Sequence, residues 1–92
     1  MFLLVHYDWN GTKERLEEYT EIHYKMAEKV EDGKFLGRFA PLNKKYNWTH
    51  VWEIKNLTTL HELMQIDAEL LDPEDWKEFG HAEMDAYAGP IQ

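Results

Sequence analysis

The first hydrophobic segment of the chain carries apolar side chains on both of its alternating sets. Over residues 2–9 one set is Phe2, Leu4, His6 and Asp8, and the other is Leu3, Val5, Tyr7 and Trp9. A strand that is apolar on both sides is typical of one that is covered on both faces. Asn10 and Gly11 end this strand, and Thr12 can cap a following helix.

Residues 12–31 show the three- and four-residue spacing of an amphipathic helix. The residues with this spacing are Leu16, Tyr19, Ile22, His23, Met26 and Val30. The pattern predicts a helix with one face packed on the rest of the protein, and Asp32 and Gly33 supply its end.

Two further β-prone segments, residues 34–42 and 46–54, are joined by a short polar connection and predict a hairpin. The second segment is the most β-prone stretch in the chain. Gly37 inside the first segment indicates either a β-bulge or a close approach of another group to the backbone. In the second case Gly37 and the adjacent Arg38 would border a pocket.

The last third of the chain predicts a second helix followed by a shorter helical turn. Asn56 or Thr58 can cap the helix. Asp72 and Pro73 then begin a turn that Trp76 and Phe79 anchor and that Gly80 ends. Residues 82–88 are predicted as a fourth strand, with a helix running to residue 87 as the alternative.

The resulting order is β-α-β-β-α-β, the plan of a ferredoxin-like α+β domain that spans residues 1–92. Both helices then cover one face of an antiparallel sheet and leave the other face bare. We expect the bare face to be apolar, with four aromatic or aliphatic side chains on it: Phe2, Leu4, Trp48 and Trp52. Such a patch indicates an interface or a ligand site.

The composition favours a small domain that gains stability by association. With 92 residues and no cysteine, the chain has a small core and no disulfide to support it. We therefore expect a homodimer. No run approaches the ~20 apolar residues of a membrane helix, and the short apolar start is unlike a signal peptide, which predicts a cytoplasmic protein without a membrane segment.

The charge distribution excludes one class of partner. The net charge of -8 repels phosphate backbones, so we expect no binding to nucleic acid. The charges are also uneven, because residues 33–52 contain basic side chains and no acid, whereas residues 67–85 contain eight acids and one lysine. These are either two solvated surfaces or an acidic end that meets the basic hairpin.

Two segments carry a resemblance to a known group of proteins. Residues 47–57, Asn-Trp-Thr-His-Val-Trp-Glu-Ile-Lys-Asn-Leu, resemble the strand-into-helix segment of NIPSNAP-like proteins. Residues 72–76, Asp-Pro-Glu-Asp-Trp, resemble a later turn of the same proteins. The chain is thus similar to the dimeric α/β-barrel superfamily. This resemblance implies two sheets that close face to face across a dimer, with a pocket inside the barrel or between each sheet and its helices.

The superfamily includes cofactor-free monooxygenases, isomerases and haem-binding enzymes, so the fold does not select a function. The residues offer one candidate site. If Phe2 lies opposite Ile54, then His6 lies opposite His50, and two imidazoles on one face can act as general acid and base. Asp8 would orient one of them. The alternative is a pair of hydrogen-bonded histidines that fill a core or an interface.

In this hypothesis Trp48 and Trp52 form the walls of the site, and Arg38 lies at its edge. Aromatic walls favour a small, flat and largely apolar ligand, and Arg38 could hold one carboxylate. No motif for a nucleotide, flavin or haem is present, so we expect no cofactor and, if there is catalysis, proton transfer of an isomerase or monooxygenase-like kind.

Other chemistry has less support. His6, His50 and Asp8, or His81, Glu83 and Asp85, could form a facial set of ligands, but neither has a spacing that specifies a metal, and no metal site is predicted. Without cysteine or serine, a nucleophilic mechanism is not expected. His23 and His61 lie beside apolar helix positions and are assigned to packing or partial exposure.

Two functions remain open at this point. One is a small-molecule-binding protein or cofactor-free enzyme, which a cavity lined by His50 and Trp52 would favour. The other is a non-catalytic structural or regulatory homodimer, which a barrel filled by side chains would favour.

Overall fold

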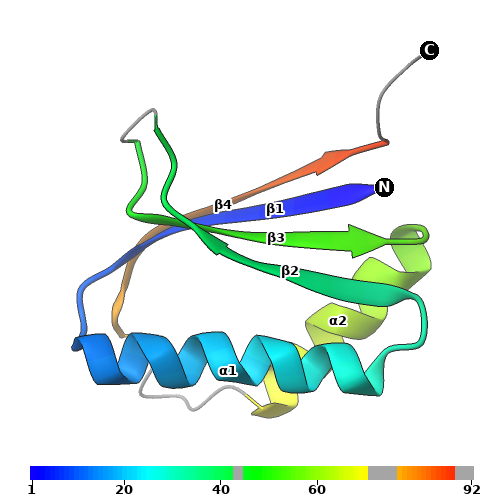
Figure 1. The fold of residues 1–92 in the computed structure, drawn as a ribbon, viewed down its shortest axis with the longest axis horizontal. Helices are drawn as coiled ribbons and strands as arrows, with labels where there is room; N and C mark the ends of the chain where they lie inside the picture. The colour runs from blue at the N-terminus through cyan, green and yellow to red at the C-terminus, as the bar shows by residue number, and fades with distance from the viewer. Residues whose placement is uncertain (43–44, 71–76, 89–92) are drawn as a thin grey trace.

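The computed structural model describes residues 1–42, 45–70 and 77–88. Its elements are β1 (Phe2–Trp9), α1 (Lys13–Lys29), β2 (Gly33–Phe39), β3 (Trp48–Ile54), α2 (Leu57–Leu70) and β4 (Phe79–Tyr87). The strands form one antiparallel sheet in the order β2-β3-β1-β4, and both helices lie against the same face of it (Figure 1). The chain is therefore an α+β protein, and this arrangement is compatible with the ferredoxin-like plan.

The helices begin where the sequence places their caps. The hydroxyl oxygen of Thr12 accepts a hydrogen bond from the backbone N–H of Arg15 at 3.2 Å, which caps α1. The side-chain oxygen of Asn56 accepts from the backbone N–H of Thr59 at 3.2 Å and caps α2. The helical turn predicted at residues 72–76 lies outside the described residues.

The predicted final strand is confirmed, but it begins at Phe79 rather than at residue 82. Phe79 pairs with Trp9 across an irregularity in β1. The prediction that Phe79 anchors a helical turn ended by Gly80 is therefore wrong. Pairing with β1 decides the conformation here, and a larger residue at Gly80 would displace the Asn10 side chain, whose Nδ2 would lie 2.9 Å from a Cβ at this position.

The β-bulge indicated by Gly37 is also present. The register between β2 and β3 shifts between Phe35 and Gly37, and Gly37 has a φ of +134°, a conformation that favours glycine. Beyond the bulge Arg38 pairs with His50, and its guanidinium group reaches α1. The bulge thus directs Arg38 to the helix-covered side of the sheet.

The register between β1 and β3 differs by one residue from the sequence-based hypothesis. The observed pairs are Phe2 with Glu53, Leu3 with Trp52, Leu4 with Val51, Val5 with His50, His6 with Thr49 and Tyr7 with Trp48. Because side chains alternate between faces, this shift places Trp48, His50 and Trp52 on the helix-covered side. The prediction that Trp48 and Trp52 lie on the bare face is wrong, although Phe2 and Leu4 do lie there.

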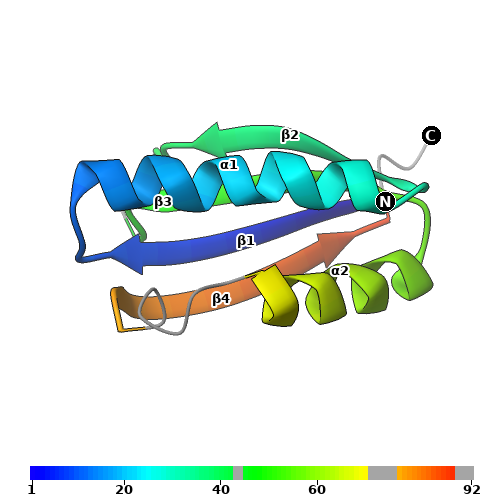
Figure 2. The same ribbon diagram turned by 90° about the horizontal axis from the view of Figure 1, so that it is seen from below.

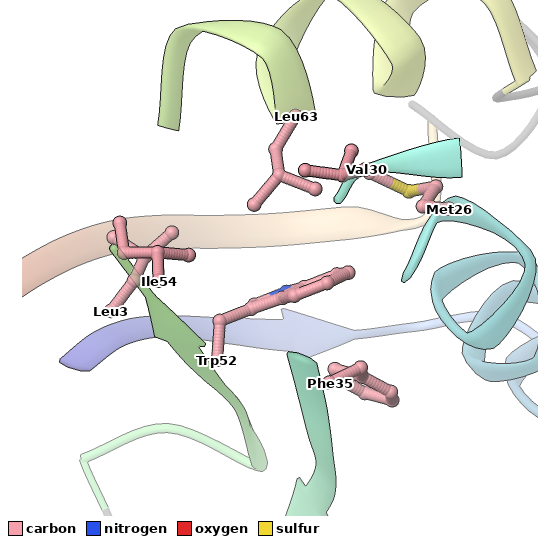
Figure 3. Close-up of a cluster of buried hydrophobic side chains, with 7 residues drawn as sticks. All are labelled: Leu3, Met26, Val30, Phe35, Trp52, Ile54 and Leu63. Atoms are coloured by element: carbon pink, nitrogen blue, oxygen red, sulfur yellow. The ribbon is translucent and has the colours of Figure 1, made fainter. Parts of the chain in front are cut away.

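The core lies between the sheet and the helices in two clusters. The first contains Leu3, Met26, Val30, Phe35, Trp52, Ile54 and Leu63, and Figure 3 shows Trp52 reaching from β3 into its centre. The second contains Tyr7, Trp9, Leu16 and Tyr19. The large aromatic side chains of β1 and β3 are buried here, which explains why the register places them under the helices.

Seen from the helix side, α1 runs along the half of the sheet that contains β2 and β3, and α2 runs beside β4 (Figure 2). Strand β1 lies between the two helices in this view. Among the described residues, no helix has both the length and the apolar character needed to cross a membrane.

Candidate functional site

The bare face of the sheet carries a polar cluster around His6. One ring nitrogen of His6, Nδ1, lies 2.8 Å from the hydroxyl oxygen of Thr49, and the other, Nε2, lies 3.0 Å from Oδ2 of Asp85. The imidazole also stacks on the ring of Tyr46, with 5.5 Å between the centroids. Both ring nitrogens therefore have partners, and Asp85 rather than Asp8 orients the ring. Asp8 instead accepts the backbone N–H of Asn47 at 2.9 Å.

The basic hairpin meets the acidic C-terminal segment beside this cluster. The Tyr46 hydroxyl donates to Glu83 at 2.5 Å, and the Lys45 ammonium group lies 3.4 Å from the same carboxylate oxygen. These hydrogen bonds, that from Tyr46 first, hold the pKa of Glu83 below its ordinary value. The basic hairpin and the acidic C-terminal segment therefore meet within one chain, as the second alternative from the sequence proposed.

His50 lies on the opposite, helix-covered side and is fully buried. Its Nε2 is hydrogen-bonded to the Tyr7 hydroxyl at 2.7 Å, and its ring lies 4.3 Å from that of His23. Burial, followed by the charges of His23 and Arg38, lowers the pKa of His50 to about 2. His50 is thus neutral, and the predicted pair of His6 and His50 on one face is not formed, since the register differs by one residue.

The remaining residues of the predicted site are also engaged elsewhere. The Arg38 guanidinium group donates to the hydroxyl of Thr20 at 2.8 Å and to the carboxylate of Glu17 at 2.7 Å, so it links β2 to α1. Its carbon Cζ lies 4.4 Å from the ring centroid of Trp48. Arg38 and Trp48 therefore hold the helix to the sheet, and neither lines the cavity described next.

A cavity of about 420 Å³ lies between the two helices and the sheet, on the side of β1 and β4. Its walls are mostly apolar and come from both strands and helices: Leu3, Val5, Met26, Trp52, Leu60, Leu63, Met64, Ala82 and Met84. Met64 and Met84 are about half exposed, at 55% and 47%, so the cavity reaches the surface between α2 and β4. Its size and lining are those of small-molecule sites.

His23, on α1, is one of the polar groups in the cavity wall. Its Nδ1 donates to the backbone carbonyl oxygen of Tyr19 at 2.8 Å. Because a carbonyl oxygen only accepts, the proton of the neutral imidazole is on Nδ1, and Nε2 carries a lone pair to which no described residue donates. Burial lowers the pKa of His23 to about 4, although the hydrogen bond to Tyr19 opposes this shift. The ring is a neutral hydrogen-bond acceptor.

Asp67, on α2, is a second polar group in the wall. Its Oδ1 is buried and has no hydrogen-bond partner among the described residues, and burial raises the pKa of the carboxyl group. A buried carboxyl oxygen without a partner costs free energy, and in native proteins such atoms are few.

No family model, curated protein or solved structure matches this chain. The chemistry of the cavity is therefore inferred from its own residues.

The two candidate sets of metal ligands from the sequence differ in how far the structure describes them. His6 and Asp8 point to the bare face and His50 to the covered face, so these three cannot share one ion. The His81 side chain lies outside the described set. Among the side chains that are described, no three histidine, aspartate or glutamate residues are grouped so that they could hold a metal ion.

Two residues of the cavity were not identified as site residues from the sequence. His23 was assigned to packing or partial exposure; its 6% exposure is that of a packed residue, but it also lines the cavity. Asp67 follows Leu60, Leu63 and Met64 at helical spacing, so it lies on the apolar face of α2. An acid within an apolar helix face was the available signal.

Proposed function

We propose that this chain is a small-molecule-binding protein whose ligand occupies the cavity between the helices and the sheet. The observation that carries the proposal is a mostly apolar cavity of about 420 Å³ in which His23 and Asp67 supply isolated polar groups. A few polar groups in an apolar wall give orientation and specificity to a ligand that apolar contact holds. The proposal moves the site from the bare face to the covered face of the sheet.

The chemistry available in this cavity is proton transfer without a cofactor. Nε2 of His23 has a free lone pair and can accept a hydrogen bond or a proton from a bound molecule. With a pKa of about 4, the ring is a weak base that releases a proton readily. Taking a proton from one atom of a ligand and returning it to another is an isomerisation, and it requires no redox group.

A ligand in this cavity is expected to change the environment of the methyl groups in the cavity wall. Titration of the protein with neutral aromatic compounds should shift the NMR signals of Leu60, Leu63 and Met84, which line the cavity. The signals of Val51, on the bare face, should stay unchanged. Shifts confined to the bare face, or no shifts with any compound, would contradict the proposal.

The role of His23 has its own expected result. His23→Phe keeps the ring volume but removes the acceptor, so a hydroxyl-bearing ligand should bind about five- to tenfold more weakly, as expected for one lost hydrogen bond. Calorimetric titration measures this change. His61→Phe, at an exposed position of α2, is the matched control and should bind as the wild type does. Equal affinities of the two variants would exclude a contact between His23 and the ligand.

We also propose that the bare face of the sheet joins two copies of the chain in a dimeric α/β barrel. The support is a group of apolar side chains on this face: Phe2, Leu4, Phe39, Val51 and Tyr87. Phe39 and Tyr87 are 51% and 54% exposed, so their apolar surface on this face is open to a partner. A purely structural or regulatory dimer would use the same face and leave the cavity without a ligand.

Light scattering at micromolar concentration is expected to give twice the chain mass of 11.1 kDa. Val51→Glu places a charge on the proposed interface and should shift the mass toward that of one chain. Leu57→Glu is the control, because Leu57 is 63% exposed on α2 and lies on the other side of the molecule. A wild-type mass of 11.1 kDa would exclude this dimer.

A further inference from the structure

We propose that Asp67 determines the specificity of the cavity, and that it selects an apolar, ring-bearing molecule with a hydrogen-bond donor and no anionic group. This inference rests on the proposed function of the cavity as a ligand site. It goes further, because it assigns a role to Asp67 and a chemical class to the ligand.

The first support is the unmet hydrogen-bonding capacity of Asp67. Its Oδ1 is buried without a partner among the described residues, on an α2 face that is otherwise occupied by apolar side chains such as Leu60 and Leu63. No described residue donates to this oxygen, which the cavity wall almost completely covers, so a rotation of the Asp67 carboxyl group would bring one of its oxygens to a partner in the cavity. A donor group on a ligand in the cavity supplies one.

The second support is the nature of the polar groups around the cavity. His23 presents a lone pair at Nε2, Asp67 presents carboxyl oxygens, and Glu83 on β4 is already hydrogen-bonded to Tyr46. Among the described residues, no lysine or arginine lines the cavity. An anionic ligand would find no cationic partner here, whereas a hydroxyl or amine group would find acceptors; the Glu83 carboxylate itself lies on the bare face with Tyr46.

The protonation state of Asp67 does not reverse this preference. Burial raises the pKa of its carboxyl group, which favours the neutral form more than in water. An ionised Asp67 accepts with both oxygens, and a protonated one still has its carbonyl oxygen as an acceptor. A ligand with a hydroxyl or amine donor is therefore recognised in either state.

The walls define the rest of the ligand. Tyr19 and Trp52 supply aromatic surface, and Met26, Met64 and Met84 supply flexible thioether side chains that adapt to a flat body. The earlier suggestion that Arg38 could hold a carboxylate does not apply to this cavity, because Arg38 is bonded to Glu17 and Thr20.

Three naphthalene derivatives of similar shape test the proposal. They are 2-naphthol, which carries a donor, 2-methylnaphthalene, which carries none, and 2-naphthoate, which is an anion. In calorimetric titrations at pH 7 the wild type should bind 2-naphthol about tenfold more tightly than 2-methylnaphthalene, as expected for a hydrogen bond to a charged or buried carboxyl group. It should bind 2-naphthoate most weakly.

Two substitutions and one control separate the role of Asp67 from that of the cavity. Asp67→Leu should bind 2-naphthol and 2-methylnaphthalene with equal affinity, because the single hydroxyl of 2-naphthol donates to Asp67 and leaves none for His23. Asp67→Asn keeps an acceptor oxygen, so it should keep the preference for 2-naphthol and should bind 2-naphthoate more tightly than the wild type does. Glu62→Gln alters the charge by the same amount at an exposed position of α2 and should keep the wild-type ranking.

The possible results have distinct meanings. Equal binding of 2-naphthol and 2-methylnaphthalene by the wild type, or an unchanged ranking in Asp67→Leu, overturns the role of Asp67 while the cavity remains a ligand site. The same loss of ranking in Glu62→Gln assigns the effect to net charge and also overturns it. If the wild type binds none of the three compounds, both this inference and the proposed function are wrong.

Discussion

Replacing Trp52 with alanine is expected to lower the free energy of unfolding by about 3–5 kcal/mol. Trp52 is 2% exposed in the first core cluster, where its ring lies 5.0 Å from that of Phe35 (Figure 3). It also lines the cavity of about 420 Å³, so its removal enlarges an existing void rather than creating one that neighbours can fill. Denaturant unfolding followed by circular dichroism measures the change.

The control for this experiment is Leu57→Ala, at a position that is 63% exposed on α2. Substitutions of exposed residues generally change stability by less than about 0.5 kcal/mol. If Trp52→Ala lowers the free energy of unfolding by less than about 1 kcal/mol, this side chain is not buried under the helices.

The elements of the fold could be predicted from the sequence because their signals are local. The capping oxygens of Thr12 and Asn56 contact N–H groups three residues further along the chain, and the bulge at Gly37 follows from a backbone conformation that other residues avoid. The local signals of the final strand were weaker, since Glu83, Asp85 and Ala86 are poor strand formers, and its first residue, which depends on pairing with Trp9, was misplaced.

The register between β1 and β3 could not be predicted, because β1 is apolar on both of its alternating sets. A shift of one residue exchanges one apolar face for the other, so the hydrophobic pattern alone does not distinguish the two registers. The contacts that distinguish them join residues distant in sequence, such as the hydrogen bond of Tyr7 with His50 and that of His6 with Thr49. The hypothesis of a His6–His50 site failed at this step.

The location of the cavity was equally beyond the sequence. It depends on the separation of α1 and α2 over β1, which results from how both helices pack on the sheet (Figure 2). The residue types carry one signal for the cavity, because Asp67 interrupts an apolar helix face. The signal from His23 is weaker, since a buried histidine on a helix is commonly a packing residue.

The second large effect is expected in acid. His23 and His50 have pKa values of about 4 and about 2 in the folded protein, both below the ordinary value near 6.5, and burial is the main cause. Between each folded-state pKa and about 6.5, the unfolded chain binds more protons than the folded one. Stability therefore rises with pH in this range and is lost as the pH falls below about 6.5. At pH 4.5 each histidine should lower the free energy of unfolding by about 2–3 kcal/mol relative to pH 7.

The sum of about 5 kcal/mol is large beside the usual stability of a small domain, so the chain should lose most of its stability by pH 4.5. The carboxylates contribute unequally. Hydrogen bonding lowers the pKa of Glu17 and Glu83, which adds to the loss at the acid end, whereas the raised pKa of Asp67 acts in the opposite direction. The histidine contribution is therefore isolated best between pH 5 and 6.5, where ordinary carboxylates stay ionised.

His23→Phe separates the histidine contribution from the others in that window. The variant should reduce the slope of stability against pH by about 1 kcal/mol per pH unit, averaged from pH 5 to 6.5, because the ring that the folded state keeps neutral is gone. Denaturant unfolding at several pH values from 5 to 7 gives this slope. His61→Gln removes an exposed histidine and serves as the comparison. A wild-type slope in His23→Phe would mean that His23 protonates as readily in the folded protein as in the unfolded chain. His23 would then not be the buried neutral acceptor on which the proton-transfer chemistry of the cavity depends.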